Sequence, residues 1–147
     1  MKYNIRAANL SDLEKIFNLQ KDYEHLLISK DALKDDLNSN SIIYFVAVTD
    51  TDNILGAIGF STLVDHIDIS IVITKKELER NGIASSILLK LIEYSKNKNI
   101  ETIFLEVRKS NSSAIKLYEK FDFKQISIRK SYYPDNNEDA LIYMLKI

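Results

Sequence analysis

Cysteine is absent from this chain of 147 residues, tryptophan is absent too, and there are only three glycines and one proline. The lack of cysteine excludes disulfide bonds, zinc sites with thiolate ligands and a cysteine nucleophile, and it suits a reducing compartment. A chain of this length buries enough surface on folding to be stable without such cross-links. Any catalysis must therefore use other groups.

The sequence also lacks an excess of one charge and a long apolar run. Lys and Arg number 20 and Asp and Glu number 21, which gives a net charge of -1, whereas non-specific binding of nucleic acid needs a broad positive excess. The longest apolar run, Ile42–Val48, is far shorter than the roughly 18 residues that span a bilayer, and the chain start has no signal-peptide core. We therefore expect a cytoplasmic protein with no nucleic-acid or membrane partner, either a monomer or a weak dimer.

The hydrophobic pattern predicts one domain over residues 1–147, because no linker, low-complexity tract or internal repeat interrupts it. Ser11 and Glu14 have the spacing of a capping box, which predicts a helix from about Asp12. The expected fold class is α/β, a mixed sheet with helices on both faces. Period-two runs predict strands and spacings of three and four predict helices, over 3–7 (strand), 12 onward and 29–38 (helices), 42–48, 54–64 and 67–73 (strands), 83–97 (helix), 101–107 (strand), 111 onward (helix), 123–132 and 140–145 (strands).

Gly82 lies where the loop after a strand becomes the first turn of a long helix. Free amides at a helix N-terminus bind anions with help from the helix dipole, and phosphate is the natural ligand. Residues 79–84, Glu-Arg-Asn-Gly-Ile-Ala, lack the Gly-Lys-Ser/Thr of a Walker loop and the other glycines of a dinucleotide fingerprint. Taken alone, the segment fits a plain helix start in which glycine relieves backbone strain.

In its context, the segment 79–84 resembles the signature of the GCN5-related N-acetyltransferase (GNAT) family, Arg/Gln-x-x-Gly-x-Gly/Ala, with Glu79 departing at the first position. From about Arg80 to Met144 the chain is similar to the bacterial ribosomal-protein-alanine N-acetyltransferases (RimI type). Residues 1–65 match only in the order of elements, the Pro-Trp pair of that branch is absent, and Asp122 stands where the family has glycine. The segments that carry the likeness are 104–111 (Phe-Leu-Glu-Val-Arg-Lys-Ser-Asn), 114–119 (Ala-Ile-Lys-Leu-Tyr-Glu), Phe123, 128–134 (Ile-Arg-Lys-Ser-Tyr-Tyr-Pro) and 138–140 (Glu-Asp-Ala).

This resemblance implies the GNAT fold, with element order β-α-α-β-β-β-α-β-α-β-β, and an enzyme that moves an acetyl group from acetyl-CoA to a primary amine without a metal. The amine attacks directly in a ternary complex, with Glu106 as base and Tyr118 as the acid that protonates the leaving thiolate. The implied acceptor is the N-terminal alanine of a ribosomal protein, in a groove shaped by Tyr132, Tyr133, Glu138 and Asp139. The implied contacts with coenzyme A come from Val72, Ile73, Thr74, Arg80, Asn81, Gly82, Ile83, Ala84, Ser85, Asn111 and Tyr118.

Each of these roles has a plainer alternative. Glu106 fits a strand carboxylate that is solvated or paired with Arg108, and Tyr118 fits a core residue of its helix. The tyrosines and carboxylates over 132–139 fit a solvated hairpin. His25 and His66 have no partners at ligand spacing and are expected at the surface or in turns.

Two other functions stay open: acetylation of a small-molecule amine or lysine, and binding of coenzyme A by a regulator without turnover. A free α-amine, with a pKa of about 7.7 to 8.0, loses its proton to a carboxylate more easily than lysine at about 10.4. This difference favours an N-terminal acceptor. The presence of both Glu106 and Tyr118 argues against the regulator.

Overall fold

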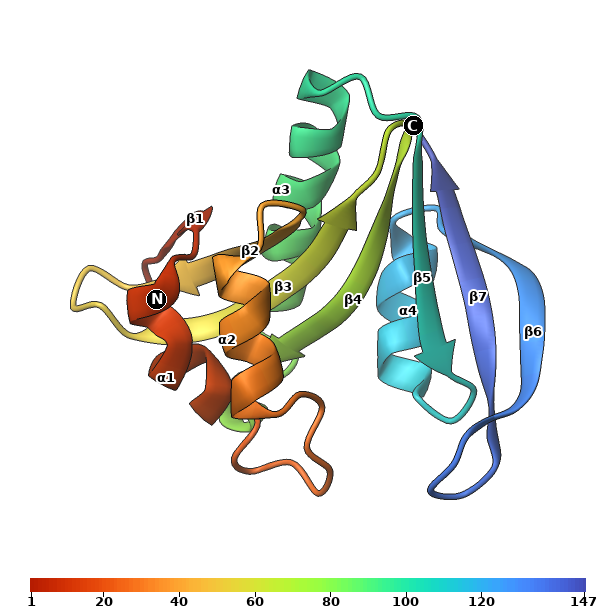
Figure 1. Cartoon of the computed structure of the whole chain (residues 1–147), viewed down its shortest axis with the longest axis horizontal. Coiled ribbons are helices and arrows are strands. Elements are labelled where there is room, and N and C mark those ends of the chain that lie inside the picture. Colours follow the sequence, from red (N-terminus) through yellow and green to blue (C-terminus); the bar gives the residue numbers. More distant parts are fainter.

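The computed structural model describes all 147 residues, and its framework is one seven-stranded sheet with strand order β1-β2-β3-β4-β5-β7-β6 (Figure 1). Neighbouring strands are antiparallel except β4 and β5, which are parallel. The predicted mixed sheet and the order of elements are confirmed. The elements are β1 (Asn4–Ala7), α1 (Leu13–Asn18), α2 (Lys30–Asn38), β2 (Ile42–Val48), β3 (Ile54–Thr62), β4 (His66–Thr74), α3 (Ile83–Asn97), β5 (Thr102–Arg108), α4 (Ser112–Lys120), β6 (Lys124–Tyr133) and β7 (Glu138–Lys146).

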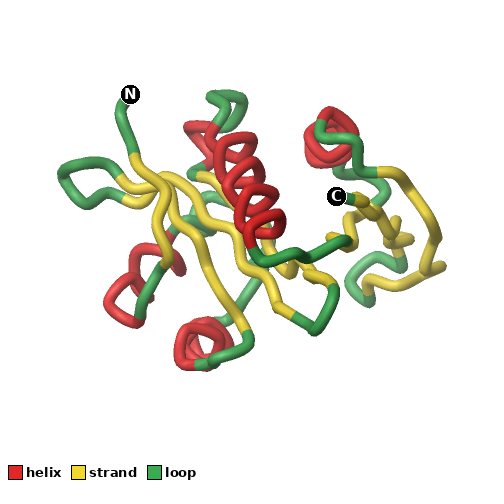
Figure 2. Tube along the Cα trace, turned by 90° about the horizontal axis from the view of Figure 1, so that it is seen from above, coloured by secondary structure: helices red, strands yellow, loops and turns green.

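Helices cover both faces of the sheet, as the sequence predicts. In Figure 2, α3 and α4 lie on one side of the strands, and α1 and α2 lie on the other. The larger core joins α3 and α4 to the sheet through fully buried side chains such as Leu88 and Ile103. A smaller core packs α1 and α2 against β2 and β3, with Leu33 of α2 fully buried. No helix combines the length and the apolar character that crossing a lipid bilayer requires.

The start of the first helix differs in detail from the prediction. The capping box is formed by Asn9 and Asp12, because the Asn9 side chain accepts from the Ser11 N–H at 3.0 Å and Asp12 accepts from the Asn9 N–H at 2.9 Å. The proposed pair of Ser11 and Glu14 is therefore wrong. Asp12 is fixed in this role by Arg6 of β1, whose Nη1 lies 2.8 Å from its carboxylate. A short 3-10 turn over Leu10–Asp12 consequently precedes α1.

The two ends of α4 agree with what the sequence predicts. Asn111 is the N-cap of α4, since its Oδ1 accepts from the Ala114 N–H at 3.2 Å. Asp122, just beyond that helix, has φ of 70°, the left-handed conformation that favours glycine. Asp122 therefore occupies the strained position that the family fills with glycine, and aspartate tolerates it better than most residues.

Candidate active site

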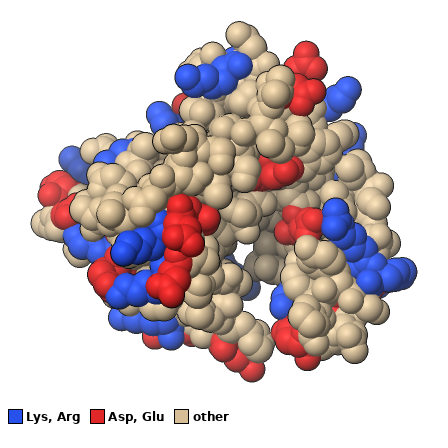
Figure 3. Space-filling view, in the orientation of Figure 1, with Lys and Arg blue, Asp and Glu red and all other residues tan.

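The parallel strands β4 and β5 separate after a short stretch of pairing. Their register runs only from His66 opposite Thr102 to Ile69 opposite Leu105, and the rest of each strand is not paired with the other. The two strands diverge downward in Figure 1, and the space-filling view shows the surface hollowed between the two halves of the molecule (Figure 3). The gap is thus a cleft between the carboxyl ends of two neighbouring strands, a position where α/β sheets bind ligands.

A bulge in β4 accounts for this separation. The register with β3 shifts between Gly59 and Phe60, which face Ile71 and Ile69, so Ser70 is the extra residue on β4. The Ser70 hydroxyl donates to the Gly59 carbonyl oxygen at 3.0 Å. A bulge bends its strand and increases the local twist. β4 therefore turns away from β5 directly after their last pair.

The main chain of β4 presents polar groups to the gap. The Lys75 N–H donates to the Leu55 carbonyl oxygen. Hydrogen-bonded and non-hydrogen-bonded pairs alternate along an antiparallel ladder, so the next facing pair, Gly56 and Thr74, shares no hydrogen bond. By the same alternation, Val72 makes no hydrogen bond to β3. The peptide groups of Val72 and Thr74 thus point away from β3, into the gap, whereas those of Ile73 bond to β3. The Thr74 carbonyl oxygen already accepts from the Tyr23 hydroxyl at 2.8 Å.

Free donors also gather at the start of α3. Gly82 is its N-cap with φ of 80°, and no side chain caps the helix. The first hydrogen bond of the helix is from Ser86 N–H to the Gly82 carbonyl oxygen at 3.0 Å, so the N–H groups of Ile83, Ala84 and Ser85 have no acceptor. Together with the dipole of this 15-residue helix, these free N–H groups form an arrangement of the kind that binds anions. Arg80 and Asn81 are exposed beside it, and Arg80 also has a positive φ, of 65°.

Glu106 lies on β5 beyond its last pair with β4. Its side chain is 34% exposed, and its Oε1 lies 3.5 Å from the Arg129 Nε of β6. The alternative partner predicted from the sequence, Arg108, pairs instead with Asp135 and Glu138. Glu106 is therefore a partly exposed carboxylate on the stretch of β5 that borders the gap.

Tyr118 of α4 is 6% exposed and packs against Phe123, with ring centroids 5.7 Å apart. Its hydroxyl makes no hydrogen bond, and no buried side-chain polar atom lacks a partner, so the hydroxyl reaches solvent at the tip of a packed ring. Burial, and then the neighbouring Tyr133, raise the pKa of the Tyr118 hydroxyl. Tyr118 is thus a protonated phenol at neutral pH, held by the core and free to donate.

Tyr133 links the two groups just described. Its pKa is raised by burial and is also affected by the charges of Arg108 and Glu106, and its own charge acts on Tyr118. The rings of Tyr132 and Tyr133 meet edge to face with centroids 5.2 Å apart, and Tyr132 is 44% exposed. Tyr133 is therefore coupled electrostatically to both Glu106 and Tyr118.

Glu138 and Asp139, the two carboxylates that the resemblance places in the acceptor groove, hold the β6–β7 hairpin through hydrogen bonds. Glu138 Oε2 accepts from the Ser110 N–H at 2.6 Å. Hydrogen bonding to Ser110, first with its side chain and then with its main chain, lowers the pKa of Glu138 to about 2. Asp139 accepts from the Ser131 N–H at 2.9 Å, which lowers the pKa of its carboxyl as well. Both side chains are thus occupied within the protein. Sequence reasoning missed this, because the N–H groups of Ser110 and Ser131 come near these carboxylates only in the folded chain.

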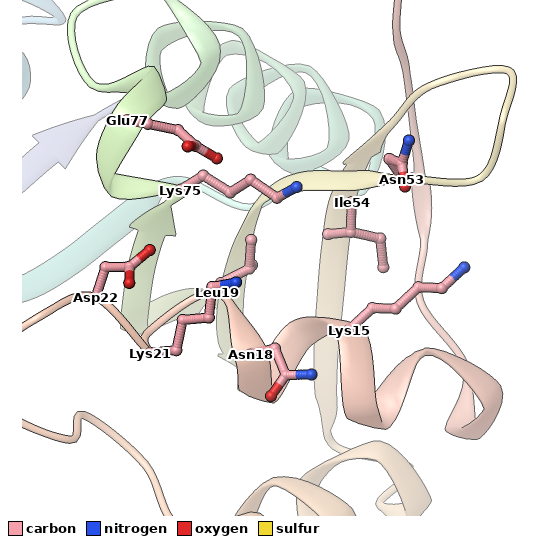
Figure 4. A pocket seen from close by; sticks show the side chains of 9 residues that line it. All are labelled: Lys15, Asn18, Leu19, Lys21, Asp22, Asn53, Ile54, Lys75 and Glu77. Atoms are coloured by element: carbon pink, nitrogen blue, oxygen red, sulfur yellow. The ribbon is translucent and has the colours of Figure 1, made fainter.

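A separate depression of about 160 Å³ lies outside the gap, near the end of α1 and the start of β3 (Figure 4). Its walls carry charges of both signs, and it contains neither Glu106 nor Tyr118. It is lined by Lys15, Asn18, Leu19, Lys21, Asp22, Asn53, Ile54, Lys75 and Glu77. The chemistry of the gap does not extend to this depression.

Comparison with known proteins shows which family and which folds the chain matches. Residues 10–123 match the acetyltransferase (GNAT) family. A ribosomal protein bS18-alanine N-acetyltransferase of Haemophilus ducreyi is 33% identical over 138 residues, which cover 91% of this chain and 93% of that protein. An N-alpha-acetyltransferase of Saccharolobus solfataricus is 31% identical over 158 aligned positions, covering 95% and 90% of the two chains.

Solved structures have the same fold. The ribosomal-protein-S18-alanine N-acetyltransferase of Escherichia coli superposes with a TM-score of 0.91 at 23% identity, over 99% of this chain and 94% of that one. Arabidopsis thaliana NAA60 in complex with acetyl-CoA superposes with a TM-score of 0.86 at 17% identity, over 99% of both chains.

Proposed function

The chain belongs to the acetyltransferase (GNAT) family and is an N-acetyltransferase, and from this premise we propose that it acetylates the α-amine of a ribosomal protein that begins with alanine. The Haemophilus ducreyi relative is named for this acceptor and aligns with nearly the whole chain. A ribosomal acceptor implies that the protein works in the cytoplasm.

The free main-chain donors fit the acetyl donor of the family, acetyl-CoA. The unbonded N–H groups of residues 83–85 suit a pyrophosphate, with Arg80 and Asn81 beside them and Gly82 giving the chain the conformation that exposes them. Val72 offers a peptide edge on which a pantetheine arm can lie as an added strand, with Ile73 and Thr74 continuing that strand. Asn111, at the N-cap of α4, completes the proposed contacts.

Acetyl-CoA supplies the thioester from which the amine takes the acetyl group. Glu106 accepts the proton that the attacking amine loses, directly or through water, because its carboxylate is accessible at the gap. A main-chain N–H of β4, such as that of Val72, donates to the acetyl oxygen as negative charge develops there. Tyr118 delivers the proton to the departing sulfur, as its protonated and unbonded hydroxyl allows.

The acceptor enters, in this proposal, beside the β6–β7 hairpin. Tyr132 and Tyr133 line the entrance with phenol rings, and Glu138 and Asp139 shape it through the bonds that hold the hairpin. An α-amine is favoured as acceptor because a carboxylate base deprotonates it far more readily than lysine.

The observation that carries the proposal is the edge of β4 left unpaired where β4 and β5 separate, with Glu106 on β5 beyond the last pair of the two strands. The test is mass spectrometry after incubation with acetyl-CoA and three acceptors: an alanine-initiated peptide, the same peptide with a blocked N-terminus and an internal lysine, and a polyamine. We expect acetyl gain only on the free α-amine. Transfer to lysine or polyamine would identify a different acceptor class, and binding of acetyl-CoA without any transfer would favour a non-catalytic regulator.

A further inference from the structure

Tyr23 connects the segment between α1 and α2 to the free edge of β4. Its hydroxyl donates to the Thr74 carbonyl oxygen at 2.8 Å, and the Lys76 Nζ lies 5.7 Å from the centroid of its ring. Burial raises the pKa of this hydroxyl, and the negative charge of Glu79 acts in the same direction. The hydroxyl is therefore a donor at neutral pH, placed where β4 turns into the loop that leads to Gly82.

The segment that carries Tyr23 is closed by one buried side chain. Gln20 is 3% exposed; its Oε1 accepts from the N–H groups of Leu27 at 2.8 Å and Ile28 at 3.2 Å, and its Nε2 donates to the Ile28 carbonyl oxygen at 2.8 Å. These bonds tie residues 20–28 into a loop with a fixed shape. A displacement at Tyr23 is consequently passed to the rest of the loop, including its tip.

The loop stands at the open end of the gap. In Figure 1 it lies below the end of β4, while the β6–β7 hairpin lies at the same level on the other side of the gap. Its tip exposes two leucines, Leu26 at 61% and Leu27 at 57%. Tyr23 holds this loop to Thr74, only two residues beyond the Val72 peptide groups that face the gap. One hydrogen bond thus joins the edge of β4 to a loop at the acceptor entrance.

We propose that Tyr23 is a positioning residue that couples occupation of the β4 edge by coenzyme A to the order of the loop 20–28. A ligand bonded to the peptide groups of Val72 restrains the end of β4, and the Tyr23 hydroxyl transmits this restraint to the loop. By thermodynamic linkage, an acceptor that orders the loop strengthens cofactor binding by the same factor. This inference rests on the proposed function, because it requires coenzyme A in the gap.

Hydrogen exchange with coenzyme A as the only added ligand tests the coupling without knowledge of the acceptor. In the unmodified protein, coenzyme A should slow exchange at the N–H groups of residues 83–85 and at those of Tyr23, Leu27 and Ile28. In Tyr23→Phe the first group should still be protected, and the second should lose most of its ligand-dependent protection. The control is Tyr94→Phe on α3, which removes a tyrosine hydroxyl that makes no hydrogen bond. This variant should show the same protection as the unmodified protein.

The outcomes separate the two proposals. If coenzyme A does not protect residues 83–85 in the unmodified protein, the cofactor site itself is wrong and the coupling falls with it. If residues 83–85 are protected but the loop is not, or if Tyr23→Phe keeps the loop protection, the coupling through Tyr23 is overturned while the cofactor site stands.

Kinetics give a second readout that a purely structural role would not produce. With the acceptor identified by mass spectrometry, Tyr23→Phe should raise the acceptor KM by about three- to tenfold at saturating acetyl-CoA, as expected for one lost hydrogen bond. The kcat should change by less than about twofold, since no reacting atom touches Tyr23. An equal fall in kcat and in kcat/KM with unchanged KM would contradict a role in positioning the loop.

Discussion

The guanidinium of Arg108 lies over the ring of Tyr133, with its Cζ 3.9 Å from the ring centroid. The same guanidinium pairs with Asp135 at 3.1 Å and with Glu138 at 3.3 Å. One cation at the end of β5 therefore holds both Tyr133 and the acidic residues Asp135 and Glu138 of the β6–β7 hairpin. Damage to this contact should affect the proposed acceptor entrance before it affects the fold.

Arg108→Ala should raise the acceptor KM by about tenfold, because Tyr133 and the hairpin lose their common support, while the melting temperature falls by only about 2 to 4 °C. Steady-state kinetics and calorimetry measure the two effects. Lys130→Ala is the control, since it removes an exposed ion pair to Asp139 in the same hairpin without touching Tyr133. Equal changes of KM in both variants would mean that Arg108 has no special role.

Glu106→Gln should lower kcat by about 100- to 10,000-fold at neutral pH, the usual contribution of a general base, and leave the dissociation constant of acetyl-CoA nearly unchanged. The amide has the shape of the carboxylate but cannot accept the proton. Glu101→Gln, just before the same strand, serves as the control and should keep full activity. An unaltered rate in Glu106→Gln would remove this residue as the base.

Tyr118→Phe should lower kcat by at least about tenfold with little change in stability, within about 0.5 kcal/mol, because the hydroxyl makes no hydrogen bond in the fold. Kinetics and thermal unfolding of the same preparation measure both quantities. If Tyr118→Phe instead loses the cooperative melting transition, Tyr118 is a core residue whose hydroxyl the fold needs.

Several features were predictable because they depend on neighbours in sequence. Asn111 caps α4, as its position before an apolar stripe predicts, and the left-handed conformation of Asp122 agrees with the glycine that the resemblance implies at this position. The sequence predicts the wrong residue pair for the capping box at the first helix, because Asn9 and Asp12 have the same spacing as Ser11 and Glu14. Arg6, on the strand before, decides between them by binding Asp12.

The contacts that build the candidate site were less accessible to sequence reasoning. Tyr23 meets a main-chain atom 51 positions away, and Glu138 meets the Ser110 N–H 28 positions away. A main-chain partner has no residue type that a sequence can display. Only the position of the strands in the sheet determines such pairs, so neither Tyr23 nor the internal role of Glu138 could be foreseen.

Gly82→Ala should weaken acetyl-CoA binding by about tenfold, because alanine at φ of 80° is strained by about 1 to 2 kcal/mol and relaxes by turning the adjacent N–H groups. A Cβ at this position meets no atom within 4 Å, so the backbone angle alone opposes the change. Gly82→Asn, which tolerates this conformation, should bind more tightly than Gly82→Ala. Titration calorimetry compares the two variants, and equal affinities would refute the argument from strain.

Acid should destabilise the protein through Glu138. Its pKa falls from 4.5 to about 2 in the folded state, so the unfolded chain binds more protons between these values and stability declines as the pH falls. The contribution is fully present above the unfolded pKa and is lost as the pH drops toward 2. Melting temperatures measured from pH 6 to pH 2 should fall less steeply in Glu138→Gln. Parallel curves would show that the Ser110 contact does not control this region.

The free donors beside the gap, at Val72 and at residues 83–85, are peptide groups rather than side chains. A point substitution at any of these positions leaves the peptide N–H in place, and only proline removes it. Substitution of the exposed side chains along this surface therefore leaves the donors in place, provided that the bulge at Ser70 and the turn at Gly82 keep the backbone on its path. Selection for ligand binding then acts on the shape of the backbone at the bulge and at the turn.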